Sequence, residues 1–506
     1  MKSPYFVGID IGTYESKGAL IDGRGDVVAT HSEKHGMENP APNHFEHDAE
    51  AVWWGDFCKI SKALLEKSAV DKTAIAAVGA SALGADLLAV DKDTKPLRKA
   101  ILYGIDARAT EEIGFLNDCY GLERVLAFNG RPLCSNDIPP KMLWLKNHEP
   151  EIHKKAHKLI TASTYLTAKL TGEYVLDRFL GLGSFSPLYD PGTLMPDDAY
   201  LPMFCRADQL ADIRDTVDIA GFVTSSAAKE THLAEGTPVI VGGDDSSAEA
   251  IGTGVLEVGD LMLQFGSSLF LIALSEKLVR DRRIWSSGFI IPNINCVMGG
   301  TNAAGTLTRW YRDNVFIDAL EEENRSGTNA YQSMMSKLHE IPAGSDGLIT
   351  LPYIAGERTP INDPKAKGAI FGLSIHHTRN HLYRSALESI GYGVAQHLDI
   401  FAENGIKINN IYAVGGGVKN RVWMQIVSDI CGCDLLTDGV ALGASYGDAL
   451  MAAIGVGYIA NFSELRKYIA PGASYAPNAD NHDKYKKYRA LFEELYAKTR
   501  GMAHAL

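Results

Sequence analysis

The chain has 506 residues, 46% of them hydrophobic and 22% charged, and this length exceeds what one hydrophobic core usually serves, so at least two domains are expected. The formal net charge of −13 at pH 7 comes without a long basic run, which argues against a nucleic-acid partner. No window approaches about 18 unbroken apolar residues, no apolar signal region precedes the first predicted strand, and the seven cysteines are scattered, so we expect a cytoplasmic protein with buried, reduced thiols and no membrane partner.

A β-hairpin is predicted at the beginning of the chain. Residues 5–9 and 17–21 have the pattern of strands, and the turn between them contains Asp10, Thr13 and Ser16. A turn of this kind can direct several N–H and O–H donors toward one anion. A plain hairpin whose turn residues are simply polar explains the same pattern, so both interpretations stay open at this point.

A loop of small residues follows the next buried strand. The loop spans 79–86 and contains Gly84 and Ala85 before it reaches Asp86. Small side chains at the end of a strand leave space for a ligand, or they permit tight packing of the backbone. A further predicted strand ends at Tyr103.

Two adjacent aspartates stand near the middle of the chain, between a strand and a helix. A buried strand is predicted over 238–241, two glycines allow a sharp turn, and a helix resumes at Ser246 after Asp244 and Asp245. Ligands of open α/β sheets bind where strand ends and helix N-termini converge. We therefore interpret Asp245 as a catalytic base. An aspartate in this position is also a common N-cap, and Asp244 suits that structural role better.

The second half of the chain opens with a motif that repeats the first hairpin. Strands are predicted over 261–265 and 269–274, and the turn between them begins with Gly266 and Ser267. This internal similarity suggests two related domains.

A glycine-rich loop at 415–417 follows a later predicted strand. It has Asn420 where a dinucleotide-binding fingerprint requires its third glycine, and it has no acidic residue at the expected offset. This argues against a dehydrogenase. The chain also lacks a Walker A loop and the protein-kinase signatures, so phosphates must be held differently.

In combination these motifs resemble the FGGY family of carbohydrate kinases. The resemblance extends from residue 5 to about residue 457. Its most specific part is 368–373 together with constrained positions within 381–388, which fit the C-terminal signature of the family. The segment 356–360 is also typical, whereas only 141–145 of the other family signature is present.

The resemblance implies an α/β fold of the actin-like ATPase superfamily, with two ribonuclease-H-like domains around an interdomain cleft. Residues 1–252 would bind the sugar and residues 253–506 would bind ATP. ATP and Mg²⁺ are the expected cofactors, a small-molecule sugar is the expected substrate, and a homodimer is possible because relatives often form one.

The resemblance also implies individual roles. Asp245 falls on the catalytic base of the family, and Asp10 would help to organise Mg²⁺. Residues near the first strand ends would bind the sugar: Gly84, Ala85, Asp86, Tyr103, Asp245 and Ser246. The two hairpins and two later helix starts would bind ATP: Thr13, Ser16, Lys17, Gly266, Ser267, Gly305, Arg309, Gly416 and Asn420. We expect an aspartate of ordinary acidity to suffice as base, since the proton leaves late in a loose transition state.

The identity of the sugar is less constrained. Family members that act on xylulose have Met-His and Trp where this chain has Gly84-Ala85 and Tyr103, which predicts a larger pocket. We favour a ketopentose such as xylulose; another ketose, a polyol or a sugar acid is the alternative. Asp86 would repel a carboxylate unless Arg108 or another cation offsets its charge. A nucleotide-binding regulator without turnover is the alternative class, and the retained Asp10 and Asp245 argue for the enzyme.

Overall fold

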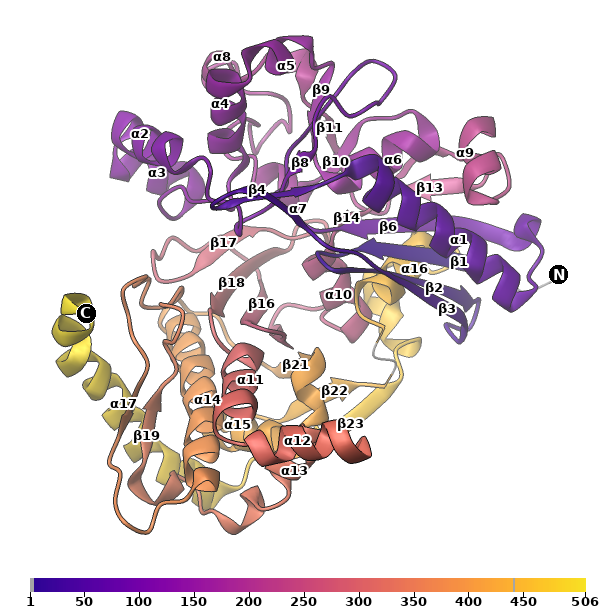
Figure 1. The fold of residues 1–506 in the computed structure, drawn as a ribbon. Helices are drawn as coiled ribbons and strands as arrows, with labels where there is room; N and C mark the ends of the chain where they lie inside the picture. The colour runs from indigo at the N-terminus through magenta and orange to yellow at the C-terminus, as the bar shows by residue number, and fades with distance from the viewer. Residues whose placement is uncertain (1–3, 440–441) are drawn as a thin grey trace.

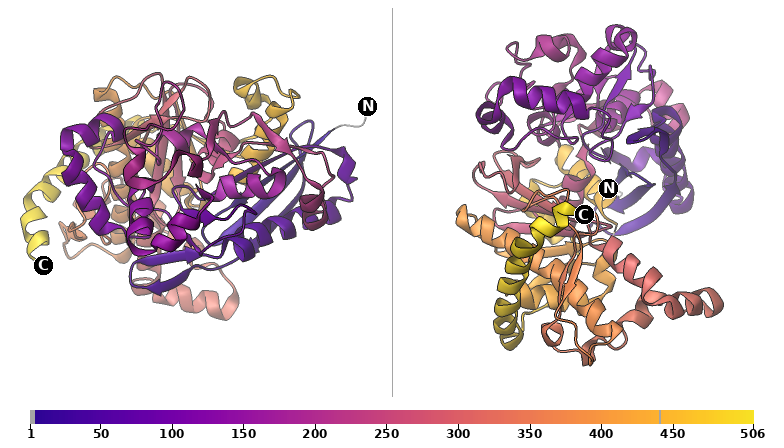
Figure 2. Two further views of the ribbon diagram at one scale, coloured as in Figure 1. Left: turned by 90° about the horizontal axis from the view of Figure 1, so that it is seen from above. Right: turned by 60° about the vertical axis from the view of Figure 1, so that its left-hand side comes forward.

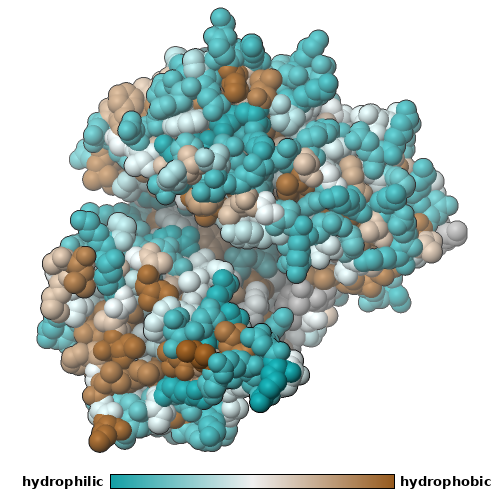
Figure 3. Space-filling model, in the orientation of Figure 1, coloured by the Kyte–Doolittle hydropathy of each residue, from teal (hydrophilic) through white to brown (hydrophobic). Residues whose placement is uncertain are grey.

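The computed structural model describes residues 4–439 and 442–506, which form two lobes with one large sheet in each (Figure 1). Residues 1–3 of the predicted N-terminal domain lie outside the described residues. A recess separates the two lobes on the face shown in Figure 3.

The N-terminal sheet has the strand order β12-β13-β6-β1-β2-β3, with β14 beside β6. Strand β1 pairs antiparallel with β2 and parallel with β6, so the first hairpin lies at the centre of the sheet. The strands are β1 (Tyr5–Ile11), β2 (Glu15–Asp22), β3 (Val27–Lys34), β6 (Ile75–Ala82), β12 (Ile219–Phe222), β13 (Pro238–Ile240) and β14 (Gly243–Asp244).

The C-terminal sheet repeats this topology in the order β17-β18-β16-β15-β21-β22-β23. Here β15 pairs antiparallel with β16 and parallel with β21, as β1 does with β2 and β6. The doubled hairpin and the two-domain α/β fold predicted from the sequence are therefore confirmed. The strands are β15 (Asp260–Phe265), β16 (Leu269–Ser275), β17 (Trp285–Gly288), β18 (Asn295–Thr301), β21 (Asn410–Val414), β22 (Leu435–Asp438) and β23 (Pro471–Tyr475).

Helices surround both sheets, and short strands lie outside the large sheets in both lobes. The helices are α1 (Gly55–Ser68), α2 (Thr110–Tyr120), α3 (Leu122–Asn129), α4 (Ile138–His148), α5 (Pro150–Lys155), α6 (Ala162–Thr171), α7 (Arg178–Leu182), α8 (Leu201–Phe204), α9 (Ser225–Thr231), α10 (Asp245–Thr253), α11 (Gly305–Asn314), α12 (Ile317–Ser326), α13 (Ala330–Met335), α14 (Arg379–Glu403), α15 (Arg421–Cys431), α16 (Ala444–Gly455) and α17 (Ala479–Ala505). The shorter strands are β4 (Glu38–Ala41), β5 (His44–His47), β7 (Leu88–Val90), β8 (Ala100–Ile101), β9 (Lys158–Ile160), β10 (Val175–Asp177), β11 (Asp212–Arg214), β19 (Ile349–Leu351) and β20 (Ala369–Phe371).

Helix α16 lies against the N-terminal sheet although it comes late in the chain (Figures 1 and 2). Its backbone approaches Gly8 of β1 so closely that a Cβ atom there would lie 2.0 Å from the carbonyl oxygen of Ser445. A helix from the predicted C-terminal domain, 253–506, therefore packs on the sheet of the predicted N-terminal domain, 1–252. That division stays a prediction.

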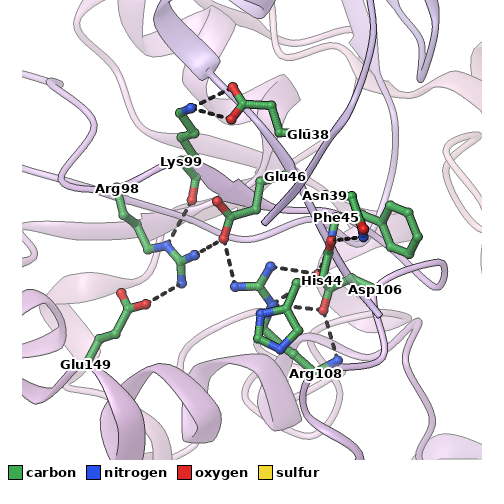
Figure 4. A network of polar contacts seen from close by, with 10 residues as sticks. All are labelled: Glu38, Asn39, His44, Phe45, Glu46, Arg98, Lys99, Asp106, Arg108 and Glu149. Carbon is green, nitrogen blue, oxygen red and sulfur yellow. Dashed lines mark hydrogen bonds and ion pairs between the residues drawn. The ribbon is translucent and has the colours of Figure 1, made fainter. Parts of the chain in front are cut away.

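A network of buried charges fixes the β4-β5-β8 sheet to the helical part of the N-terminal lobe (Figure 4). The guanidinium of Arg108 contacts Asp106 at 2.8 Å and Glu46 at 2.9 Å, and Arg98 also contacts Glu46. Both guanidinium groups lie over the ring of Trp144, that of Arg98 at 5.5 Å and that of Arg108 at 4.9 Å from the ring centroid. Arg108 is fully committed to this network, so it does not serve as the free cation considered for a sugar acid.

All seven cysteines are free thiols. Cys205 and Cys296 are buried, whereas Cys119 is exposed, so the expectation that all the thiols are buried is wrong for this residue. Within the described ranges, no helix is long and apolar enough to cross a membrane.

Candidate active site

The turn of the first hairpin presents its two faces to different surroundings. Asp10 and Lys17 are paired across β1 and β2, and the ammonium group of Lys17 lowers the pKa of Asp10 against stronger opposing effects. Successive side chains of a strand point to opposite faces. Ser16 therefore points away from Lys17, is fully buried, and donates a hydrogen bond to Asp56 at 3.1 Å.

This placement corrects the expectation for Ser16. Its hydroxyl is engaged behind the hairpin with Asp56, so it does not face the side on which Lys17 stands. Thr13 lies in the turn and donates its hydroxyl hydrogen to the hydroxyl of Tyr103 at 3.1 Å. Burial raises the pKa of Tyr103, and the nearby charge of Asp245 raises it further. Tyr103 therefore contacts the hairpin, and its pKa responds to the charge of Asp245.

The first of the two central aspartates has the structural role that the sequence predicts for it. Asp244 is the N-cap of α10 and accepts hydrogen bonds from the backbone N–H of Ser247 at 2.8 Å and from the hydroxyl of Ser246 at 2.9 Å. This confirms Asp244 as the cap and explains Ser246, whose hydroxyl is used by the cap. Asp245 is the first residue of the helix and remains partly accessible.

Three other carboxylates influence the pKa of Asp245. Burial and the charges of Asp244, Asp10 and Glu249 raise the pKa of Asp245 well above its usual value. Burial and Glu249 likewise raise the pKa of Asp10 to about 7. The expectation of ordinary acidity at Asp245 is therefore wrong, because the site concentrates negative charge where a cation or a proton would relieve it.

A buried acid from α16 supports this cluster from behind. The hydroxyl of Ser81 lies 2.7 Å from Asp448 and 3.2 Å from Asp10, so it links the two carboxyl groups. Asp448 is fully buried, and burial raises its pKa well above the usual value. Helix α16 thus reaches the candidate site through Ser81.

The small-residue loop after β6 does not leave the space expected of it. A Cβ atom at Gly84 would lie 2.8 Å from a carboxylate oxygen of Asp244 and 3.3 Å from the side chain of Leu180. Ala85 is buried and has a positive φ of 66°. Asp244 thus fills the space beside Gly84, so the alternative of tight packing holds at this position, and the larger sugar pocket stays a prediction.

Asp86 is fully buried, and no side chain of the described residues hydrogen bonds to either of its carboxylate oxygens. Burial raises its pKa to about 7, while the ammonium group of Lys141 acts in the opposite direction. Asp177, which the sequence reasoning missed, has a similar environment: it is the N-cap of α7, and burial raises its pKa to about 7.

The second hairpin meets the beginning of α11. The backbone N–H of Gly305 donates to the carbonyl of Gly266 at 2.9 Å, and the N–H of Ala304 donates to the carbonyl of Ser267 at 3.0 Å. Arg309 lies one turn further along α11 and is exposed. The structure thus brings Gly266, Ser267 and Gly305 together.

The glycine-rich loop after β21 leads into α15. Asn420 is the N-cap of this helix and accepts a hydrogen bond from the backbone N–H of Trp423 at 3.0 Å. Within residues 4–439 and 442–506, no atom beyond its immediate neighbours lies within 4 Å of a Cβ built on Gly416, so the backbone there is open to an approaching group. The oxygen of the Asn420 side chain is already used by the helix.

Groups from both lobes meet at Trp285. Arg131 and Arg358 each lie 5.9 Å from the centroid of its ring. Arg358 donates to the carbonyl of Thr301 at 3.0 Å, while its Nε is buried without a hydrogen-bond partner among the described residues. The sequence reasoning missed Arg358 and Glu249. Glu249 could have been found, since residues four apart on a helix share a face with one another.

The two related lobes, each opening with a glycine- and hydroxyl-containing hairpin, define an ATPase-type fold of the actin-like superfamily. The chain belongs to the FGGY family of carbohydrate kinases: its residues 5–252 match the N-terminal domain of that family and residues 261–456 match the C-terminal domain. It is therefore an enzyme, a phosphotransferase that uses ATP.

Known relatives cover the whole chain. A xylulose kinase of Staphylococcus epidermidis is 29% identical over 497 residues, which are 98% of this chain and 97% of that protein. The crystal structure of xylulose kinase from Rhodospirillum rubrum has a TM-score of 0.89 and 26% identity, and covers 99% of this chain and 100% of the other. A gluconokinase of Bacillus subtilis is 26% identical over 497 residues, covering 97% of this chain and 95% of its own length.

Proposed function

We propose that this kinase phosphorylates a hydroxyl group of a ketopentose such as xylulose, with Asp245 as the general base. The observation that carries the proposal is the position of Asp245 at the first residue of α10, near Asp10. Asp10 belongs to the first hairpin, β1 and β2, which we call the phosphate hairpin. The similarity to xylulose kinases over nearly the full chain supports this substrate.

In the proposed reaction the sugar hydroxyl oxygen bonds to the γ-phosphorus, the bond from this phosphorus to the bridging oxygen breaks, and ADP leaves. Asp245 takes the proton of the hydroxyl. Its raised pKa makes the carboxylate a stronger proton acceptor than an exposed aspartate. Lys17 stands on the face of the hairpin opposite Ser16, where its positive charge would stabilise the phosphates.

The carboxylate of Asp10 fits Mg²⁺, which prefers hard oxygen ligands and is usually held by one or two carboxylates with water and substrate phosphates. The crowded charge that raises the pKa of Asp10 is the observation that favours a cation here. When bound, Mg²⁺ would neutralise charge on the phosphates. The described part of the chain has no group of three or more His, Cys, Asp or Glu placed to hold a metal ion.

Sugar acids are the second candidate class. Arg108 is not available to pair with a carboxylate, but the buried Nε of Arg358 lacks a partner among the described residues. A carboxylate bound at Arg358 would satisfy this donor, and the similarity to a gluconokinase agrees with it.

The test is ADP release from Mg²⁺-ATP with a panel of ketopentoses, polyols and aldonic acids. We expect the highest kcat/KM with xylulose. A preference for an aldonic acid that disappears in Arg358→Met would select the second candidate. ATP binding without ADP release for any sugar would instead support a nucleotide-binding regulator. A homodimer and a cytoplasmic location stay predictions.

The two neighbouring residues of β2 provide a separate test of the hairpin. We expect Lys17→Ala to lower kcat/KM for ATP by about 100-fold, because it removes the charge that faces the phosphates. Ser16→Ala should lower kcat/KM only slightly and instead reduce the free energy of unfolding by about 1–2 kcal/mol, since a buried hydrogen bond to Asp56 is lost. Steady-state kinetics and urea unfolding measure both effects. A larger kinetic loss in Ser16→Ala would contradict the assignment of the two faces.

A further inference from the structure

A buried histidine lies directly behind the turn of the phosphate hairpin. The side chain of His35 is 7% exposed, and its Nδ1 lies 2.9 Å from a carboxylate oxygen of Asp56. Its Nε2 lies 3.1 Å from the carbonyl oxygen of Gly12, and its backbone N–H donates to the carbonyl of Tyr14 at 3.0 Å. The residue thus connects helix α1 to the turn that the proposed function assigns to phosphate binding.

The partners of the ring specify its protonation. A carbonyl oxygen only accepts hydrogen bonds, and an ionised carboxylate does the same. Burial alone would raise the pKa of Asp56, but hydrogen bonds from His35, Lys59 and Ser16 hold it below the usual value. The contacts of the ring with Asp56 and with Gly12 are therefore both hydrogen bonds only when both ring nitrogens carry a proton; the hydroxyl of Ser16, 3.5 Å from Nδ1, donates to Asp56 instead.

The bond to Gly12 also determines where the next N–H group points. In a planar trans peptide the C=O of one residue and the N–H of the next point in opposite directions. Because the carbonyl of Gly12 points back at His35, the N–H of Thr13 points to the other side of the turn. The hydroxyl of Thr13 is bound to Tyr103, so the backbone N–H is the donor that Thr13 retains for an anion.

The charged and titratable groups around His35 are few. Helix α1 contributes Asp56 and Lys59, which lie 3.0 Å apart. Strand β5 contributes His47, edge-on to His35 at 5.2 Å between ring centroids. The indole of Trp53 donates to Nδ1 of His47 at 3.1 Å, and burial together with His35 lowers the pKa of His47 to about 4, so its ring stays neutral. Two further carboxylates influence these groups: the charge of Glu33 raises the pKa of Lys59, and the charge of Glu38 opposes the lowering of the pKa of His47.

We propose that His35, with both ring nitrogens protonated, is a positioning residue that directs the Thr13 N–H of the hairpin toward a nucleotide phosphate. The inference rests on the proposed function of this hairpin. The positive ring also polarises the Gly12–Thr13 peptide, which strengthens its N–H as a donor.

The first test is kinetic. The amide group of glutamine cannot donate hydrogen bonds to Asp56 and to Gly12 at once, as the two nitrogens of the histidine ring do. His35→Gln should therefore raise KM for Mg²⁺-ATP about tenfold and leave KM for the sugar unchanged. His153→Gln is the matched control. His153 is a half-buried histidine on α5, and its Nε2 lies 2.7 Å from the carbonyl oxygen of Phe204. Equal changes in both KM values, accompanied by a lower Tm, would reduce His35 to a structural residue and overturn the proposal.

The second test reads the ring itself. In nucleotide-free enzyme, ¹⁵N chemical shifts of the His35 ring should report two protonated nitrogens under the same buffer conditions in which calorimetry shows ATP binding. His35→Gln should bind ATP more weakly under those conditions. A ring with one proton at a pH where ATP binds tightly would overturn the proposal. Tight ATP binding by a wild type that phosphorylates no sugar would contradict the proposed function only, since both readouts of His35 remain measurable.

Discussion

Asp245→Asn is expected to fold, to bind ATP and to lose kcat by roughly 10²–10⁴-fold, the usual contribution of a positioned general base. Asparagine has nearly the shape of aspartate but accepts no proton from the sugar hydroxyl. In the wild type, kcat should rise with pH as Asp245 ionises, and the raised pKa of Asp245 moves this rise above the range of an ordinary aspartate. Steady-state kinetics with Mg²⁺-ATP between about pH 5 and about pH 9, a range wide enough to follow the ionisation of the base, measures both effects.

The same variant should be more stable than the wild type. A carboxyl whose pKa is higher in the folded chain favours folding most below its unfolded value of about 4, and this contribution is lost as pH rises through the folded value. Asn cannot ionise, so Asp245→Asn should exceed the wild type in free energy of unfolding by about 1 kcal/mol or more at high pH, with the difference shrinking toward about pH 4. A variant that is inactive because it misfolds would show the opposite sign.

Asp244→Asn is the matched control for this charge removal. Asparagine is as good an N-cap as aspartate, so the hydrogen bond from the Ser247 N–H should persist. We expect kcat to fall less than tenfold in Asp244→Asn. Unchanged turnover in Asp245→Asn, together with a large loss in Asp244→Asn, would assign the base to Asp244.

The elements that follow from local patterns could be predicted from the sequence. The two hairpins at 5–21 and 261–274 appear as strands on either side of a polar turn, and their repetition indicates the doubled fold. The role of Asp244 as an N-cap is local as well, because it depends only on the residues at the beginning of α10. Helix α16 itself is predicted by the run of small residues up to Gly455, but its place on the N-terminal sheet is not, since small residues fit any buried surface and the partner strand lies at the other end of the chain.

The errors at the site arise where distant segments meet. Gly84 suggests an open pocket until Asp244 is placed beside it. The sequence leaves Arg108 without a partner, whereas in the structure Glu46 from β5 binds it. The raised pKa of Asp245 depends on Asp10, which comes from another strand. Ser16 is different, because the alternation of side chains along a strand would have separated it from Lys17 without a structure.

Gly8→Ala is expected to destabilise the N-terminal sheet strongly, because the added methyl group meets the backbone of α16. The new Cβ atom would lie 2.0 Å from the carbonyl oxygen of Ser445 and 2.5 Å from the backbone nitrogen of Ala449. Backbone atoms of a helix cannot rotate away as a side chain can, so α16 must move off β1. We expect a loss of about 3 kcal/mol or more in the free energy of unfolding, measured by urea denaturation.

Displacement of α16 should also reach the chemistry, because Asp448 on this helix is linked through Ser81 to Asp10. We therefore expect kcat of Gly8→Ala to fall even at temperatures where the variant remains folded. Gly288→Ala in β17 is the matched control: the nearest atom to its new Cβ would be 3.9 Å away, and both stability and kcat should stay close to the wild type. Equal stability of Gly8→Ala and Gly288→Ala would show that α16 does not pack on β1 as described. A destabilised Gly8→Ala with the kcat of the wild type would show that the position of α16 does not affect the active site.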